Sequence, residues 1–152
     1  MLIRTHLAIT LFFALLLVDY VKFPVFFIAI ALISTYIPDI DSKTSKMGSN
    51  ILFRPLQWIS RHRGMIHSFT FLISIVFLFA LFIPILSLPF FVGYSSHLLA
   101  DSFTIEGIKP FYPMRHKSSG NIITGSLTET NILILFLVLD FVFFAVNFSS
   151  IF

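Results

Sequence analysis

The sequence predicts an all-α, polytopic membrane protein that forms a single domain, residues 1–152, with about five transmembrane or partly inserted helices. Hydrophobic residues make up 57% of the 152 residues and charged residues only 11%, whereas soluble domains contain about 25% charged residues. The 21 Phe residues lie mostly in apolar runs separated by polar loops. Because so few polar side chains are available to cover a surface in water, lipid is the expected solvent.

Five apolar segments are expected to form these helices. Their expected limits are, in order, Leu7 to Val18 (extendable to Val21), Phe23 to Ile37, Phe69 to about Leu88, Pro89 to about Leu99, and Ile132 to Phe148. The first segment could pass for a signal peptide, but no small-residue cleavage site follows it, so it is interpreted as an uncleaved span. Pro38 is expected to end the second helix, and Pro84 and Pro89 to break or kink the stretch between the third and the fourth.

The segments differ in length and in what flanks them. Only the third and the fifth approach the ~20 residues needed to cross a bilayer, and the fourth could instead be re-entrant. The stretch Ser126 to Glu129 has the form of a capping box that opens the last helix. Residues 42–61 form a polar connection in which "ILFRPLQWIS" mixes apolar and polar residues, as an interfacial element would.

Charge predicts the orientation in the cell membrane. Alternating the direction of five crossings places nine of the ten basic residues on one side and only Lys22 on the other. Because cytoplasmic loops carry an excess of Lys and Arg, the first side is expected to be cytoplasmic. The predicted multi-pass topology has the N-terminus inside and the C-terminus outside.

Seven ionisable side chains from four segments are expected on that same cytoplasmic side. Ionisable groups at membrane depth are costly, about 2.5–3.5 kcal/mol each on insertion scales, unless they pair or coordinate. The chain has no cysteine, so any metal must be held by imidazole and carboxylate, which suits zinc or another first-row ion. We expect one or two divalent ions, with two favoured. The predicted metal ligands are His6, Asp39, Asp41, His62, His67, His97 and Asp101.

The spacing within these motifs supports shared ligation. His97 and Asp101, in "HLLAD", are four residues apart, which stacks them on one helix face. Asp39 and Asp41, in "PDID", are two apart in an expected non-helical turn, where alternate side chains can point the same way. In "HRGMIHS", Gly64 would let the backbone bend so that His67 enters the third helix aimed at the site.

A phosphoester hydrolase mechanism fits these residue types. Asp39, Asp41 and Asp101 are the candidate catalytic carboxylates, with Asp39 or Asp41 accepting a proton when it is not saturated by metal. Guanidinium groups match phosphate oxygens, so three arginines are candidates for substrate binding, although they could equally contact anionic lipid as topology determinants. These are Arg61, Arg63 and Arg115. A phosphorylated membrane lipid is the expected substrate, and nucleic acid is the second choice.

Four motifs in order resemble a known family. "TH" at residues 5 and 6, "PDID", "HRGMIHS" and "GYSSHLLADSFTIEGIKPFYP" resemble the YdjM-type family of membrane-bound metal-dependent hydrolases, from residue 5 to about residue 130. The resemblance implies metal ligation by His6, Asp39, Asp41, His67, His97 and Asp101, with His62 beside them.

A fainter likeness extends to other hydrolases. The order His, Asp, His and then H-x-x-x-D is similar to the group of zinc-dependent phospholipases C and P1-type nucleases. The further ligands of that group have no counterpart at matching spacing here, where Glu106, His116 and Glu129 follow.

Two other classes of function stay open. A metal-binding transporter would be expected to have polar residues in both halves of the bilayer, and a non-catalytic scaffold would hold a structural metal. Three isolated groups have ordinary interpretations: a solvated loop residue for His116, a helix cap for Glu129 and a protonated or hydrogen-bonded carboxyl for Asp140. Glu129 could alternatively reach back to the site.

Overall fold

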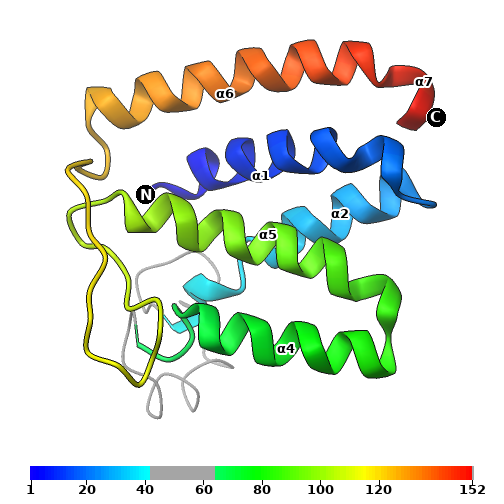
Figure 1. Ribbon diagram of the computed structural model, residues 1–152. Helices are drawn as coiled ribbons and strands as arrows, with labels where there is room; N and C mark the ends of the chain where they lie inside the picture. The colour runs from blue at the N-terminus through cyan, green and yellow to red at the C-terminus, as the bar shows by residue number, and fades with distance from the viewer. Residues whose placement is uncertain (42–63, 152) are drawn as a thin grey trace.

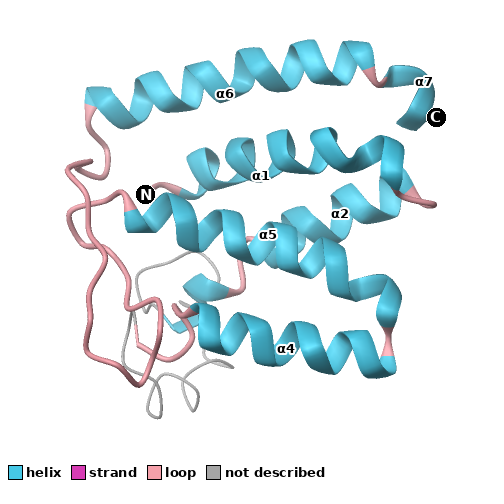
Figure 2. Ribbon diagram, in the orientation of Figure 1, coloured by secondary structure: helices cyan, strands magenta, loops and turns pink. Residues whose placement is uncertain are grey.

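The computed structural model describes residues 1–41 and 64–151 (Figure 1). These residues form helices and loops with no strand, as predicted (Figure 2). The elements are α1 (Ile3–Leu17), η1 (Val18–Tyr20), α2 (Pro24–Ser34), η2 (Pro38–Asp41), α4 (Phe69–Phe82), α5 (Pro84–Ser102), α6 (Leu127–Val146) and α7 (Phe148–Ile151). The expected interfacial element at 51–60 lies outside the described residues.

The five long helices alternate in direction and pack as a row. Helix α6 packs on α1, α1 packs on α5, and α5 packs on α4, while α2 lies against both α1 and α5. One end of the bundle carries the start of α1, the end of α5 and the loop between α5 and α6 (Figure 1). The opposite end carries the C-terminus and the connections from α1 to α2 and from α4 to α5.

Short capping signals fix where the helices begin. Ser68 precedes α4, and its side chain accepts a hydrogen bond from the Phe71 nitrogen at 3.2 Å. Ser126 does the same before α6, accepting from the Glu129 nitrogen at 3.3 Å. Such caps satisfy backbone donors that have no partner within the helix. The predicted helix start at the "SLTE" stretch is therefore confirmed.

The boundary between the third and fourth helices was predicted wrongly. Helix α4 ends at Phe82, and α5 begins at Pro84 and continues through Pro89 to Ser102. Proline is well suited to the first position of a helix because its missing N–H would have no helical partner there. The 19 residues of α5 extend over about 28 Å, so this helix is longer than the expected segment from Pro89 to Leu99.

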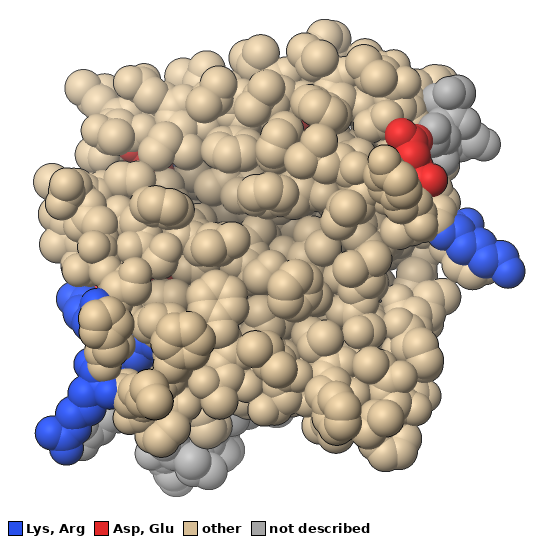
Figure 3. All heavy atoms as spheres, viewed as in Figure 1, with Lys and Arg blue, Asp and Glu red and all other residues tan. Residues whose placement is uncertain are grey.

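The surface is apolar along most of the helices. Phe77 on α4 is 62% exposed and Phe141 on α6 is 75% exposed. On the face shown in Figure 3, Lys and Arg appear at the two ends of the molecule and leave an almost uncharged band between them. Among the residues that the structure describes, two helical stretches are long and apolar enough to cross a membrane, Ile3–Tyr20 and Leu127–Val146. Two shorter apolar helical stretches are Pro24–Ile40 and Phe69–Phe82.

A glycine lets α2 and α5 approach closely. A Cβ atom on Gly93 would lie 2.0 Å from the Ala31 carbonyl oxygen and 2.9 Å from the Ser34 Cβ. Small residues are typical of helix contacts in membranes, where close backbone packing replaces the hydrophobic effect. Because Gly93 lies one helical turn before His97, this contact also sets the position of His97 relative to the end of α2.

We expect Gly93→Ala to destabilise the protein, because the new methyl group must push α2 away from α5. The expected loss is about 1–3 kcal/mol, the usual penalty of overpacking, and it should lower the midpoint of thermal unfolding in detergent. Leu99→Ala is the matched control, since Leu99 lies on the same helix and is 44% exposed. Equal unfolding midpoints for Gly93→Ala and the wild type would show that the close contact between α2 and α5 does not contribute to stability.

Candidate metal centre

Five of the predicted ligands lie at the same end of the bundle. His6 lies in the first turn of α1, Asp39 in η2, His67 just before α4, and His97 and Asp101 one turn apart near the end of α5. The expectation of a non-helical "PDID" turn was wrong, because Pro38–Asp41 forms a 3-10 turn. That turn nevertheless brings the Asp39 carboxylate to the cluster.

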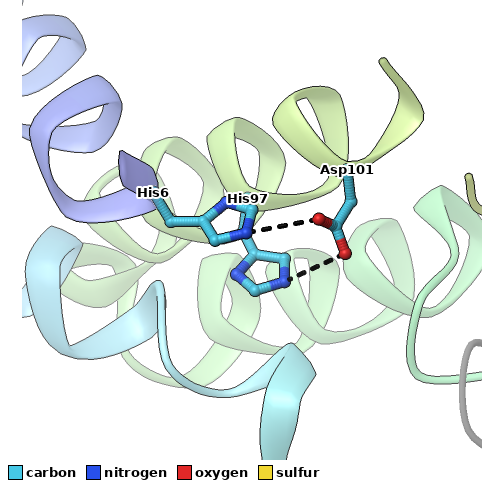
Figure 4. Close-up of side chains that lie close together, drawn as sticks. All are labelled: His6, His97 and Asp101. Carbon is cyan, nitrogen blue, oxygen red and sulfur yellow. Dashed lines mark ion pairs between the residues drawn. The ribbon is translucent and has the colours of Figure 1, made fainter. Parts of the chain in front are cut away.

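The first group of ligands consists of His6, His97 and Asp101, all almost fully buried. His6 Nε2 lies 3.3 Å from one Asp101 carboxylate oxygen, and His97 Nε2 lies 3.8 Å from the other. The two imidazole rings are stacked, with centroids 3.9 Å apart. Figure 4 shows both rings beside the Asp101 carboxylate, although α1 and α5 are far apart in the sequence.

The second group consists of Asp39, His67 and His97, so His97 belongs to both. The Asp39 oxygen lies 3.8 Å from His97 Nε2, and His67 Nε2 lies 3.9 Å from Asp101. Within each group the ligand atoms lie within 4.8 Å of one another. Ligands of a tetrahedral zinc ion at its usual bond lengths are about 3.4 Å apart, so small side-chain shifts would let either group supply three ligands to one ion.

A backbone hydrogen bond fixes the tautomer of His97. Its Nδ1 lies 2.9 Å from the Thr35 carbonyl oxygen, and a carbonyl oxygen only accepts, so Nδ1 carries the proton. A neutral imidazole then has its lone pair on Nε2, which is buried and has no hydrogen-bond partner among the described residues. A lone pair directed toward two carboxylates is unfavourable without a cation between them, and such backbone contacts are typical of metal-binding histidines.

Burial also affects Asp39, whose side chain is 24% exposed. Burial raises the pKa of the Asp39 carboxyl above its ordinary value, although the nearby His6 and His67 lower it. A cation in the cluster would favour the ionised carboxylate again. The donor set of imidazoles and carboxylates without thiolate therefore fits a divalent first-row ion such as zinc.

Buried hydrogen bonds hold the ligand-bearing segments together. The Tyr94 hydroxyl on α5 donates to the carbonyl oxygen of Ile66, the residue before His67. Deeper in the bundle, the Thr35 hydroxyl donates to Thr10 Oγ1 at 2.8 Å, and Thr10 Oγ1 lies 2.6 Å from Ser96 Oγ. These contacts join α1, the end of α2 and α5 directly below the cluster.

Glu129 has a larger role than that of a helix cap. Its carboxylate accepts hydrogen bonds from the Leu2 nitrogen at 2.6 Å, from the Thr5 hydroxyl at 2.9 Å and from the Gly125 nitrogen at 2.6 Å. It therefore attaches the start of α6 to the residues just before His6. The capping pattern was visible in the sequence, whereas the long-range partners depend on α6 packing against α1.

The other predicted site residues do not join the cluster among the described contacts. Arg115 and His116 are exposed on the loop between α5 and α6. Asp41 closes η2, but its side chain lies outside the described part. Three further candidates belong to the segment that the structure does not describe: Arg61, His62 and Arg63.

Asp140 lies apart from the cluster on α6. It is only 5% exposed, and its carboxyl oxygens have no hydrogen-bond partner among the described residues. The interpretation of a protonated carboxyl is compatible with this apolar environment, whereas the alternative bond to another helix is not observed.

In the part of the chain that the structure describes, the fold and the cluster define an all-helical, strongly apolar protein with a largely buried group of imidazoles and carboxylates that could hold a metal ion. The chain belongs to the family described as YdjM inner membrane protein, whose model matches residues 1–151. The predicted family is therefore confirmed, and with it a membrane location. The hydrolase activity that the resemblance implied stays a prediction, as does the fainter likeness to phospholipases C and P1-type nucleases.

Two curated relatives illustrate the similarity. The uncharacterized protein YvsG of Bacillus subtilis (strain 168) is 32% identical over 116 residues, which cover 72% of each chain. The inner membrane protein YdjM of Escherichia coli (strain K12) is 34% identical over 99 residues, which cover 56% of this chain and 48% of that protein. No solved structure matches the chain.

We expect the purified protein to bind zinc and His97→Gln to lose it, because this substitution removes the ligand shared by both groups. Metal content measured by mass spectrometry should fall at least about tenfold, the lower range for losing a metal-site contact. His116→Gln, the same change at an exposed histidine, should retain the metal. Equal zinc content in the wild type and in folded His97→Gln would argue against this centre.

Proposed function

We propose that the protein is a multi-pass membrane hydrolase that uses a divalent metal, most simply zinc, to cleave a phosphoester of a membrane lipid at the cytoplasmic face. One observation supports this most strongly: five imidazole and carboxylate side chains from four separate segments meet in a buried cluster at one end of an apolar bundle. Such a cluster is expensive to bury without a cation. Family membership supports the membrane location.

The chemistry follows from the residues present. His6, His67, His97, Asp39 and Asp101 would hold one or two ions, the second group sharing His97 with the first. When bound, a divalent ion supplies Lewis-acid chemistry toward a phosphoryl oxygen and makes water a competent nucleophile near neutral pH. Asp39 is the most exposed carboxylate of the cluster, so it is best placed to accept a proton from an incoming water.

The charge distribution supports the proposed orientation. Lys109, Arg115 and Lys117 lie on the loop between α5 and α6, at the same end as the cluster, whereas Lys22 lies between α1 and α2 at the other end. An excess of basic residues marks the cytoplasmic side of a membrane protein. The metal centre and the N-terminus would therefore face the cytoplasm, and the C-terminus would be outside.

The absence of native cysteine makes this topology testable by labelling. We expect Lys22→Cys to react with a membrane-impermeant maleimide in intact cells, because this exposed position would be outside. Lys117→Cys should react only after the membrane is opened. The reverse pattern would place the cluster at the outer face, and labelling of both positions in intact cells would contradict an odd number of crossings between them.

Hydrolysis is tested with purified, zinc-loaded protein in detergent and a panel of phosphorylated lipids, with release of phosphate or headgroup as the measurement. We expect Asp39→Asn to lower kcat about 100-fold or more, the usual contribution of a general base. Asp19→Asn makes the same chemical change at the opposite end of the bundle and should leave kcat unchanged.

One outcome would contradict hydrolysis, and another would contradict the role of Asp39. A wild-type protein with bound metal that releases nothing from any lipid would indicate a structural ion. Cleavage that is equally fast in Asp39→Asn and the wild type would remove Asp39 from the mechanism.

A further inference from the structure

An apolar cavity of about 510 Å³ lies between α1, α5 and α6. None of the residues that line it has a charged or hydroxyl-bearing side chain. Its wall includes Ile9 and Phe13 of α1, Leu99 of α5, Phe103 just after α5, and Ile132 and Phe136 of α6. The volume is typical of sites that hold small ligands, and such a lining suits hydrocarbon.

The cavity borders the metal centre. Ala100 lines it and immediately precedes Asp101 in α5, and Ile9 follows His6 by three residues in α1. Met1 contributes to both places, because it lines the cavity while its nitrogen lies 2.6 Å from an Asp101 carboxylate oxygen. A molecule that fills the cavity would therefore have one end beside the cluster.

From this juxtaposition we propose that the cavity binds one hydrocarbon chain of the lipid whose phosphoester reaches the metal centre. The inference rests on the proposed function and names long-chain phosphoesters as the preferred substrates of the site, over nucleotides and other soluble phosphate esters. A nucleotide would leave polar groups of its base and sugar against a wall that offers no hydrogen bonds, and unpaired polar groups are costly to bury. A hydrocarbon chain makes no hydrogen bonds, so it has none to lose when it is buried there.

Part of the lining of the cavity is exposed on the outer surface of the protein, which supports a lipid as its occupant. Leu99 is 44% exposed and Phe103 is 60% exposed, so a chain could enter sideways from surrounding lipid. A smaller cavity of about 310 Å³ lies at the opposite end, lined in part by Lys22, Phe26 and Leu88. None of its lining residues belongs to the metal cluster, so it serves as an internal comparison.

The bilayer and the cavity are both apolar, so transfer of a chain between them gains little free energy, and the cavity would select chains by shape. Binding should gain free energy when the chain comes from water instead of the bilayer, as it does for short-chain phospholipids dissolved as single molecules. For these, each methylene that enters the cavity should improve affinity about fourfold. The improvement should stop once the cavity is full.

The test uses the zinc-loaded protein in lipid nanodiscs that contain phosphatidic acid with a photoactivatable diazirine in one acyl chain. After illumination, peptides of α1 and α6 that line the cavity should be labelled more strongly than the more exposed face of α4 around Phe77, which is 62% exposed. Ile132→Trp should fill the cavity from α6, which carries no proposed ligand, and lower this labelling about tenfold. Val138→Trp, on the exposed side of α6, should label like the wild type.

Hydrolysis of p-nitrophenyl phosphate separates failure of this inference from failure of the proposed function. If Ile132→Trp cleaves this soluble ester like the wild type but loses chain labelling, the cavity assignment is supported. If labelling of Ile132→Trp equals that of the wild type, the assignment is wrong, whatever the hydrolysis shows. If no variant cleaves any ester while labelling still falls, the hydrolase proposal fails and the chain site stands.

A second substitution keeps the inference testable even if Ile132→Trp misfolds. Phe136→Ala enlarges the cavity without adding bulk, so the dependence of affinity on chain length should continue for more methylenes than in the wild type. An unchanged chain-length limit in a folded Phe136→Ala protein would overturn the assignment.

Discussion

The bundle depends on a buried electrostatic constraint: a carboxylate and three imidazoles are held together in surroundings that offer little water. Asp101 is 2% exposed and has His6, His67 and His97 around it. The Met1 nitrogen lies 2.6 Å from one Asp101 oxygen, whereas His97 Nε2 has no hydrogen-bond partner among the described residues. Burying such a group costs free energy that packing elsewhere must offset. With a cation, the same atoms become an attractive set, so metal binding and folding are expected to be coupled.

Close helix packing makes this constraint tolerable. The contact between Gly93 and Ala31 brings the end of α2 to α5, and this proximity allows the Thr35 carbonyl to accept the proton of His97 Nδ1. The hydroxyls of Thr10, Thr35 and Ser96 satisfy one another just below. Between helices in a membrane, interhelical hydrogen bonds and small residues stabilise association in place of hydrophobic burial. The centre is therefore built on backbone proximity as much as on its ligands.

Much of the site could be predicted from the sequence because it depends on residue spacing within one helix and on the alternating direction of successive helices. The four-residue spacing of His97 and Asp101 places them on one helix face, and alternating helix directions bring His6 and Asp39 to the same end. The long-range partners of Glu129, the bond from His97 to Thr35 and the cavity could not be predicted, since each depends on how two helices pack. The α4 to α5 boundary was missed for a different reason: Pro84 and Pro89 are equally good breakers in sequence, and only packing decides which one opens a helix.

The position of the centre at the helix ends explains how one site could serve both water and lipid. Asp39 remains partly exposed toward the loops, whereas Asp101 is buried and adjoins the apolar cavity through Ala100. A soluble reactant would arrive from the Asp39 side and a hydrocarbon chain from the side of α6, and the two would meet only at the cluster. A centre deeper in the bundle would lose access to water, and a centre on the loops would lose the chain. The combination of candidate ligands near the ends of α2 and α5 with an adjoining apolar cavity is therefore a geometry that would suit the proposed lipid phosphoesterase.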